Sequence, residues 1–332
     1  MNSFALVSAP GNETINLLEG EFKTYNQTQE LQDKCGFFIS GFGLNQTLLV
    51  LEVKEIFSIT EDEVLKLKVQ PSTQIITNNT SDKLHYIQIV EEAIQLMSKA
   101  DATLKKIVLA NSKSNIIDFN PLLLFLSLVK MYPNSFVYLT KIDKENMWIG
   151  ASPELLLRTT TQNRFKTTSL AGTLTNKNAP WTNKEFEEQE FVTQYILEEL
   201  SNQGIATEVK GPIEIQNGHL RHLQSEITIK GENLHAFELI NILHPTPAIN
   251  GIPKNAAYNF IHAKEKEQRG YYSGIIGLVQ TEKTIAHVNL RCARIAANGL
   301  TLYAGAGITK NSNAEKEWEE TQNKMKIIEN LL

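Results

Sequence analysis

The feature that most constrains the fold is the way strand-like and helical apolar patterns follow one another along the whole chain. The last third holds three strand-like runs, and the turn Ala297-Asn298-Gly299 between the second and third is typical of a β-hairpin. Helical periodicity occurs between such runs, as in the segment from Lys83 to Met97, whose apolar residues share one face. Long strands with helices between them indicate an α+β or a layered α/β fold rather than a repeat or a helical bundle.

Expected elements cover most of the chain. Residues 1 to about 80 are expected to form strands and loops, because short apolar stretches there are broken by Gly, Asn and Thr. A helix is expected to start at Asn120-Pro121, with Asn as the cap and Pro at the first helical position. Further helices are expected over residues 183–199, 233–243, 255–268 and from 314 to the C-terminus. Strands are expected over residues 106–110, 136–140, 147–151, 165–170, 274–280, 284–296 and 300–304.

Composition excludes several classes of function. The 332 residues carry a net charge of -5 with no basic block, which argues against a nucleic-acid partner. The longest apolar run, Pro121–Val129, is too short to cross a bilayer, and Met1–Pro10 lacks the pattern of a signal peptide. Two cysteines, Cys35 and Cys292, are too few for a disulfide framework. We therefore expect a cytoplasmic protein without a membrane partner.

Two pairs of glutamates recur at the same helical spacing. Glu185 and Glu188 lie three residues apart in one expected helix, and Glu317 and Glu320 do so in the last one. Positions i and i+3 share a helical face, so each helix can present two carboxylates to one point. Mg²⁺ prefers such hard oxygen ligands. The alternative is a solvated, charge-rich helix face.

A lysine and a glutamate stand out for their apolar surroundings. Lys106 opens an apolar strand, and a lysine in an apolar cleft has a lowered pKa and can act as a base. Glu154 lies between Pro153 and three leucines, where an acid tends to have a raised pKa and can donate a proton. The structural alternatives are a strand end capped by Lys106 and a turn capped by Glu154.

Other residues suit the binding of carboxylates. Arg291 is expected mid-strand, where its planar fork needs an acidic partner. The stretch from Ala304 to Gly307, with Gly305 in it, is expected to form a turn after a strand that aims backbone N–H groups at an anion. Candidates with ordinary structural alternatives are Lys324 beside Glu320, His244 at the start of His-Pro-Thr-Pro, and Ala171, Gly172 and Thr173 at the end of a strand.

These segments occur together in one order, and in that order the sequence resembles the chorismate-utilising enzymes. That family includes isochorismate synthases, salicylate synthases and the large subunits of anthranilate synthase. The resemblance covers about residues 100 to 330, and the segments that carry it, besides the two glutamate pairs, are Lys106–Leu109, Gly150–Arg158, Leu170–Thr173, His244–Lys254, Arg269–Gly274, Leu290–Ala293, Tyr303–Ile308 and Glu317–Lys324.

The resemblance implies an α+β fold of two packed, mainly antiparallel sheets flanked by helices. Residues 1–332 would form one chorismate-binding domain, with 1–80 a shortened N-terminal part and 81–332 the family core. It implies Mg²⁺ held most directly by Glu188 and Glu320, with Glu185 and Glu317 nearby. It also implies Lys106 as general base, Glu154 as general acid, and a substrate site formed by Ala171, Gly172, Thr173, His244, Tyr272, Arg291, Gly305, Gly307 and Lys324.

Within the family, the sequence is most similar to isochorismate synthases, whose product enters menaquinone or siderophore synthesis. Members that use water carry a lysine at the position of Lys106, and Ala171 stands where aminodeoxychorismate synthases often have a lysine. Pro247-Ala248-Ile249 follows the isochorismate-synthase pattern. The alternative is salicylate synthase, which also eliminates pyruvate. Asn111 and Gln189 depart from residues common in relatives. No obligatory protein partner is expected.

Overall fold

Two antiparallel sheets form the centre of the molecule. The computed structural model describes residues 3–12, 14–25, 31, 33–44, 47–78, 82–161, 164–174, 180–217, 220–231, 233–266, 268–281 and 283–332. The first sheet has the order β14 (Gly251–Ile252), β7 (Lys106–Ile116), β18 (Gly299–Ile308), β17 (Cys292–Ala296), β9 (Met147–Ser152), β8 (Phe136–Lys141), β1 (Phe4–Ser8), β2 (Ile15–Glu19) and β6 (Phe57–Ile59). The second has the order β12 (Ala206–Asn217), β13 (Leu220–Lys230), β11 (Arg164–Leu174), β10 (Leu155–Thr161), β16 (Lys283–Val288), β15 (Ile275–Gln280), β4 (Gly36–Ser40), β5 (Leu48–Glu52) and β3 (Phe22–Tyr25).

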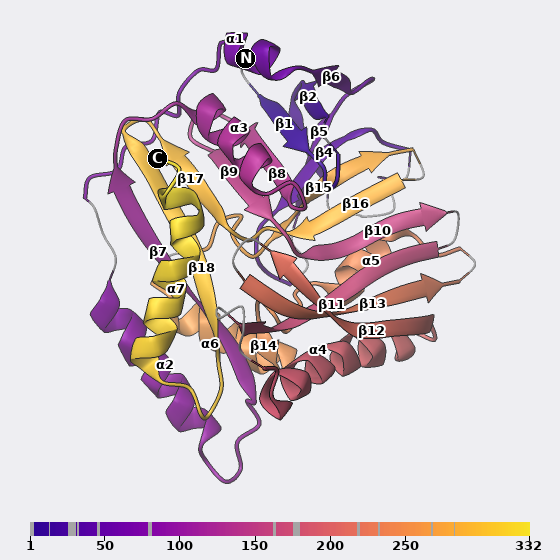
Figure 1. Ribbon diagram of the computed structural model, residues 1–332, viewed down its shortest axis with the longest axis vertical. Coiled ribbons are helices and arrows are strands. Elements are labelled where there is room, and N and C mark those ends of the chain that lie inside the picture. The colour runs from indigo at the N-terminus through magenta and orange to yellow at the C-terminus, as the bar shows by residue number, and fades with distance from the viewer. Residues whose placement is uncertain are drawn as a thin grey trace.

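Helices cover the outer face of each sheet (Figure 1). The helices are α1 (Glu61–Lys66), α2 (Lys83–Met97), α3 (Pro121–Met131), α4 (Asn183–Ser201), α5 (Ala236–Leu243), α6 (Lys254–Lys264) and α7 (Ala314–Glu329). The first sheet carries α1, α2, α3, α6 and α7, and the second carries α4 and α5. Between the sheets lies an aromatic core that includes Phe37, Tyr138, Trp148, Tyr272 and Tyr303. The expected α+β fold of two packed antiparallel sheets with flanking helices is confirmed.

Several local expectations are also confirmed. Asn120 caps α3, because its Oδ1 accepts a hydrogen bond from the Leu122 N–H at 2.9 Å, and Pro121 is the first helical residue. The Asn298 turn joins β17 to β18 as a hairpin in which Ala296 lies opposite Gly299. The first 80 residues are mostly strands and loops, and they complete the far end of both sheets with β1, β2 and β6 in one and β3, β4 and β5 in the other.

Other expectations are wrong. The single strand expected over 284–296 is two strands in different sheets, because the chain leaves the second sheet after Val288 and enters the first at Cys292. Arg291 therefore lies in the crossover and not mid-strand, with a φ of 49° that interrupts extended backbone. The stretch Ala304–Gly307 is not a turn but part of β18. The long hairpin of β12 and β13 was not expected.

The helices that were expected at 233–243 and 255–268 are shorter, and α5 begins only at Ala236. No helix in the described ranges is both long enough and apolar enough to cross a membrane.

Candidate active site

Lys106 opens β7, and its side chain lies on the face of the first sheet that is turned toward the second. In the ladder between β7 and β18, Val108 lies opposite Gly307 and Ala110 lies opposite Gly305. Side chains of alternate residues share a face, so Lys106, Val108 and Ala110 point the same way. A Cβ added at Gly307 would lie 3.2 Å from Cε of Lys106, so the glycine leaves the space that the lysine side chain occupies.

Three carboxylates from three different elements surround the Lys106 ammonium. Burial lowers the pKa of Lys106, while the charges of Glu188, Glu154 and Glu320 act in the opposite direction. Glu188 comes from α4, Glu154 from the connection between β9 and β10, and Glu320 from α7. The structure therefore brings the expected base, the expected acid and one member of each glutamate pair together.

Glu154 is held where the chain passes from the first sheet to the second. Its carbonyl oxygen accepts a hydrogen bond from the Val288 N–H at 3.0 Å. Burial raises the pKa of its carboxyl from 4.5 to about 7, and the charges of Lys106, Arg291 and Lys324 only partly oppose this shift. The group can therefore carry a proton near neutral pH, as a general acid requires.

Arg291 lies in the crossover from β16 to β17, beside the crossover from β9 to β10 that holds Glu154. Its carbonyl oxygen accepts a hydrogen bond from Ala151 N–H at 3.1 Å, which ties this crossover to the end of β9. Burial lowers the pKa of the guanidinium, and Tyr132 and Glu154 act in the opposite direction. Arg291 is thus a half-buried cation within electrostatic reach of the acid, and it suits a carboxylate of a ligand.

The backbone of β18 offers N–H groups to the same space. Val108 N–H donates to Asn250 O at 2.9 Å, on the side of β7 away from β18. Gly307, opposite Val108, therefore directs its own N–H away from β7, and so does Gly305 two residues earlier. The next strand, β17, reaches only as far as the pair of Cys292 with Tyr303. The glycine N–H groups thus point past the end of β17, and an extended strand rather than the expected turn directs them.

Lys324 and Tyr272 complete this side of the site. Lys324 Nζ donates to Gly305 O at 2.8 Å and to Glu320 Oε1 at 2.7 Å. A Cβ added at Gly305 would lie 2.7 Å from the Tyr272 hydroxyl oxygen, so the phenol lies against the glycine. The Tyr272 ring stacks on Tyr303 at 5.8 Å, and Tyr303 stacks on Trp148 at 5.4 Å. This aromatic column fixes the direction of the Tyr272 hydroxyl.

The end of β11 forms the opposite wall. Gly172 has a φ of 69° and lies at an irregularity in the pairing of β11 with β13. A Cβ added there would lie 3.1 Å from both Cβ and the carbonyl oxygen of Glu185, so glycine allows α4 to pass close to the strand. Ala171 lies in the same strand and is half-buried, while Thr173 pairs with His222 and its side chain lies outside the described part.

His222 is a site residue that the sequence did not reveal. It is buried on β13, hydrogen-bonds to the Gly172 backbone, and lies within electrostatic reach of Arg291 and Lys324. Burial and the Arg291 charge lower its pKa to about 4, so the imidazole is neutral near pH 7. Its hairpin shows no distinctive motif, and only the pairing of Thr173 with His222 brings it to the site.

The position of His244 is set by α5 and by Lys254. It caps the C-terminus of α5, and its carbonyl oxygen accepts a hydrogen bond from Lys254 Nζ at 2.8 Å. Its surroundings include Ser40, Phe237 and Ile275, which belong to or cover the outer side of the second sheet. Burial lowers the pKa of His244 to about 3, which fits a neutral residue of the packed interior.

The glutamates fit a divalent cation in part. Glu188 and Glu320 come from different helices, and both act on the pKa of Lys106. Glu185 Oε2 instead accepts the Thr182 N–H at 2.9 Å as part of a capping box. Within the described residues, no three His, Cys, Asp or Glu side chains are gathered as an ion site. Two carboxylates with water and a ligand are a donor set that Mg²⁺ accepts, so the residues present fit this ion.

Comparisons with known proteins agree with this arrangement. A family model described as chorismate binding enzyme matches residues 43–332. The chain is 28% identical over 287 residues to the isochorismate synthase MenF of Escherichia coli, a match that covers 81% of this chain and 65% of that protein. It is 27% identical over 264 residues to anthranilate synthase component 1 of Aquifex aeolicus, covering 74% of this chain and 52% of that protein. The chain thus spans between half and two thirds of the length of these relatives.

Solved structures share the fold. The structure of the menaquinone-specific isochorismate synthase MenF from Escherichia coli matches with a TM-score of 0.81 at 22% identity, over 99% of this chain and 88% of that one. Anthranilate synthase component I from Streptococcus pneumoniae matches with a TM-score of 0.71 at 18% identity, over 99% and 90% of the two chains. At these identities the likeness concerns the arrangement of the sheets and helices.

The contact between Gly172 and α4 can be tested with a matched pair of variants. Gly204 has a φ of 71° with nothing within 4 Å of an added Cβ, so Gly204→Ala introduces only the backbone strain, roughly 1–2 kcal/mol. Gly172→Ala introduces the same strain and also a clash with Glu185. We expect urea denaturation to show a larger loss of unfolding free energy for Gly172→Ala, and equal losses would contradict the close packing of β11 on α4.

The raised pKa of Glu154 predicts a pH dependence of stability. Between pH 4.5 and about 7, folded Glu154 holds a proton that the unfolded chain has released. The free energy of unfolding therefore falls as pH rises through this window, by on the order of 2–3 kcal/mol. Glu154→Gln should lack this component, so its stability relative to wild type should increase between pH 5 and pH 8 in denaturant titrations. A constant difference would show that Glu154 titrates normally.

Proposed function

Because this chain belongs to the chorismate-binding enzymes, we propose that it catalyses the isomerisation of chorismate to isochorismate. The observation that carries the proposal is the pairing of Lys106 with Glu154. Burial lowers the pKa of the lysine and raises that of the glutamate to about 7. Two groups whose pKa values move in opposite directions can act as base and acid at the same pH.

The two groups would act on opposite ends of one substitution. Neutral Lys106 takes a proton from a water molecule as its oxygen attacks ring carbon C2. The ring double bonds shift, the bond from C4 to its hydroxyl breaks, and Glu154 donates its proton so that the hydroxyl leaves as water. One water enters and one leaves, so the product is an isomer of the substrate. Proton transfer from Lys106 back to Glu154, directly or through water, restores the starting state.

The rest of the site would hold the substrate in register with these groups. Arg291, the Tyr272 hydroxyl and the N–H groups of Gly305 and Gly307 suit the enolpyruvyl carboxylate. Ala171 and Gly172 would border the ring, with His222 supporting the backbone at Gly172. Lys324 donates to the carbonyl oxygen of Gly305 and so holds this residue with its N–H directed at the ligand.

A magnesium ion would bind at the end of the site formed by α4 and α7. Glu188 and Glu320 are the side chains that would hold it, and Glu185 and Glu317 lie on the same two helices. When bound, the ion would anchor and polarise the ring carboxylate of the substrate. The chain's own contribution is to place two carboxylates from separate helices next to the base.

Water is the nucleophile that these residues favour. A lysine base can deprotonate water, which fits Lys106, and the position of Ala171 offers no amine for a covalent adduct with the ring. The relatives named isochorismate synthase in the comparisons support the same choice. No observation favours pyruvate elimination.

The roles of the base and the acid are tested by product analysis. Wild-type protein incubated with chorismate and Mg²⁺ in ¹⁸O-labelled water should yield isochorismate labelled at C2, without pyruvate. Lys106→Ala and Glu154→Gln should each lower kcat by on the order of 10²–10⁴ while circular dichroism stays unchanged. Lys105→Ala is the matched control, because that neighbouring side chain is exposed. Wild-type rates in Lys106→Ala or Glu154→Gln would refute the mechanism, and release of pyruvate would identify a salicylate synthase.

The metal assignment is tested by the Mg²⁺ concentration that gives half-maximal activity. We expect Glu188→Gln and Glu320→Gln each to raise it by at least tenfold, since each removes a charged ligand. Glu187→Gln and Glu319→Gln change neighbouring exposed carboxylates on the same helices and should leave it unchanged. Full activity of the wild type after dialysis against EDTA would contradict the requirement for a metal.

A further inference from the structure

We propose that the buried ion pair of Glu265 and Arg269 is a positioning device for the active site, because it takes the place of a missing neighbour strand along β7. The inference rests on the proposed function, in which Lys106 on β7 is the base. Neither member of the pair is assigned a contact with substrate. Both would act through the backbone that carries Lys106.

The edge of β7 needs such a device. Its pairing with β14 covers only Lys106 and Ile107, whereas its pairing with β18 continues to Ile116. From Val108 onward the outer edge of β7 has no strand beside it in the described part of the chain. Buried backbone N–H and C=O groups without partners are costly, so other groups must satisfy them.

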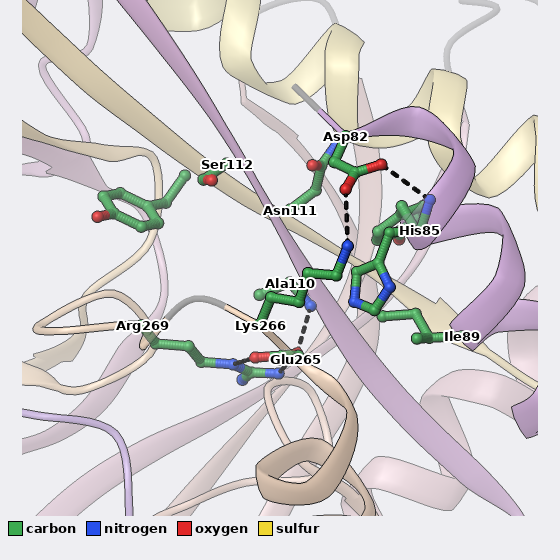
Figure 2. Close-up of a pocket in the computed structure, with 11 residues that line it drawn as sticks. Asp82, His85, Ile89, Ala110, Asn111, Ser112, Glu265, Lys266 and Arg269 are labelled. Carbon is green, nitrogen blue, oxygen red and sulfur yellow. Dashed lines mark hydrogen bonds and ion pairs between the residues drawn. The ribbon is translucent and has the colours of Figure 1, made fainter. Parts of the chain in front are cut away.

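The ion pair supplies those partners. Arg269 Nη2 donates to Val108 O at 2.7 Å, and Glu265 Oε1 accepts the Ala110 N–H at 2.8 Å. Arg269 Nη1 also donates to Ile249 O at 2.9 Å, so the same ion pair holds the segment that precedes β14. Figure 2 shows the Arg269 fork against Glu265 and the carboxylate directed at the backbone of Ala110.

The pair is rigid and almost fully buried. Arg269 Nε and Nη2 lie 2.8 and 2.6 Å from the two Glu265 oxygens, and the side chains are 4% and 8% exposed. The guanidinium also lies over the ring of Phe42, 4.2 Å from its centroid. A buried ion pair adds little net stability compared with apolar packing, but its bidentate geometry defines a single arrangement. The pair therefore serves to fix the position of the main chain that it contacts, and not only to stabilise the fold.

The ion pair bonds the main chain of Val108 and Ala110, whose side chains face the site. Lys106, Val108 and Ala110 alternate along β7, so the main-chain groups that the pair holds belong to the inward-facing set. Arg269 O also accepts the Tyr272 N–H at 3.0 Å, so the same residue starts the turn that presents Tyr272. The pair thus connects the strand of the base Lys106 to Tyr272, which is proposed to bind the enolpyruvyl carboxylate.

The pair acts by position rather than by its charge. The charges that act on the pKa of Lys106 are those of Glu188, Glu154, Lys324 and Glu320. Loss of the ion pair would move Lys106 relative to these groups and to the substrate. A displacement of about 1 Å at a reacting group costs on the order of 10²-fold in rate.

Glu265→Gln, Arg269→Lys and the double variant Glu265→Met/Arg269→Met test the proposal. Steady-state rates with chorismate and Mg²⁺ are measured against pH, below each variant's melting temperature. We expect kcat to fall 10- to 100-fold with KM changed less than threefold, and the pH dependence of kcat to shift as Lys106 leaves its carboxylates. The double variant should be more stable than either single variant, because no charge is left unpaired. It still leaves Val108 O, Ala110 N–H and Ile249 O without these partners, so kcat should not recover.

Glu329→Gln is the matched control. Glu329 Oε1 pairs with Lys113 Nζ, further along the same strand, so this variant also removes a charge that is paired with β7. We expect a lower melting temperature with wild-type kcat and pH profile. If the Glu265 and Arg269 variants behave like this control, or if the double variant regains kcat together with stability, the pair is only structural and the proposal is overturned. The rates are measured for whichever product the wild type forms. A product other than isochorismate would refute the proposed function, and the comparison of variants would still test the role of the ion pair.

Discussion

The ladder between β7 and β18 is the interaction on which the rest of the site depends. Its register puts Gly307 opposite Val108, where a Cβ would lie 3.2 Å from Cε of Lys106 and crowd the lysine side chain. The same register turns the N–H groups of Gly305 and Gly307 away from β7 and into the space that β17 leaves open. A slip by one residue would reverse every one of these directions, because side chains and main-chain groups alternate with period two.

The second constraint is that two of the crossovers between the sheets, from β9 to β10 and from β16 to β17, meet at this place. Glu154 follows β9 on the way to the second sheet, and Arg291 precedes β17 on the way back. Chain that leaves one sheet for another is irregular, so it can direct a carboxylate and a guanidinium into the gap between the sheets. Burial in that gap then shifts their pKa values and that of Lys106, which makes the same packing the source of both geometry and acid–base chemistry.

The helices supply charge from outside the sheets. Glu188 lies on α4, which packs on the second sheet, and Glu320 lies on α7, which packs on the first. The two glutamates are therefore far apart in sequence although both act on the same base. The edge of β7, where no strand continues, is closed by the fork of Glu265 and Arg269 (Figure 2). The adjoining pocket of about 130 Å³, which Asp82, His85 and Lys266 help to line, lies along this edge. Within it Lys266 pairs with Asp82, so these two charges satisfy each other.

The sequence by itself determined the class of fold, most of the regular elements and the chemical types at the site. Helical periods, the Asn120 cap and the Asn298 turn are local features, because each depends on residues within one or two turns of chain. The unusual surroundings of Lys106 and Glu154 were visible for the same reason. Tertiary structure alone decided that residues 284–296 divide between two sheets and that His222 enters the site. These outcomes depend on pairings such as Thr173 with His222, between residues about fifty positions apart. A sequence pattern records whether a residue will be buried, but the register of distant strands decides what it is buried against.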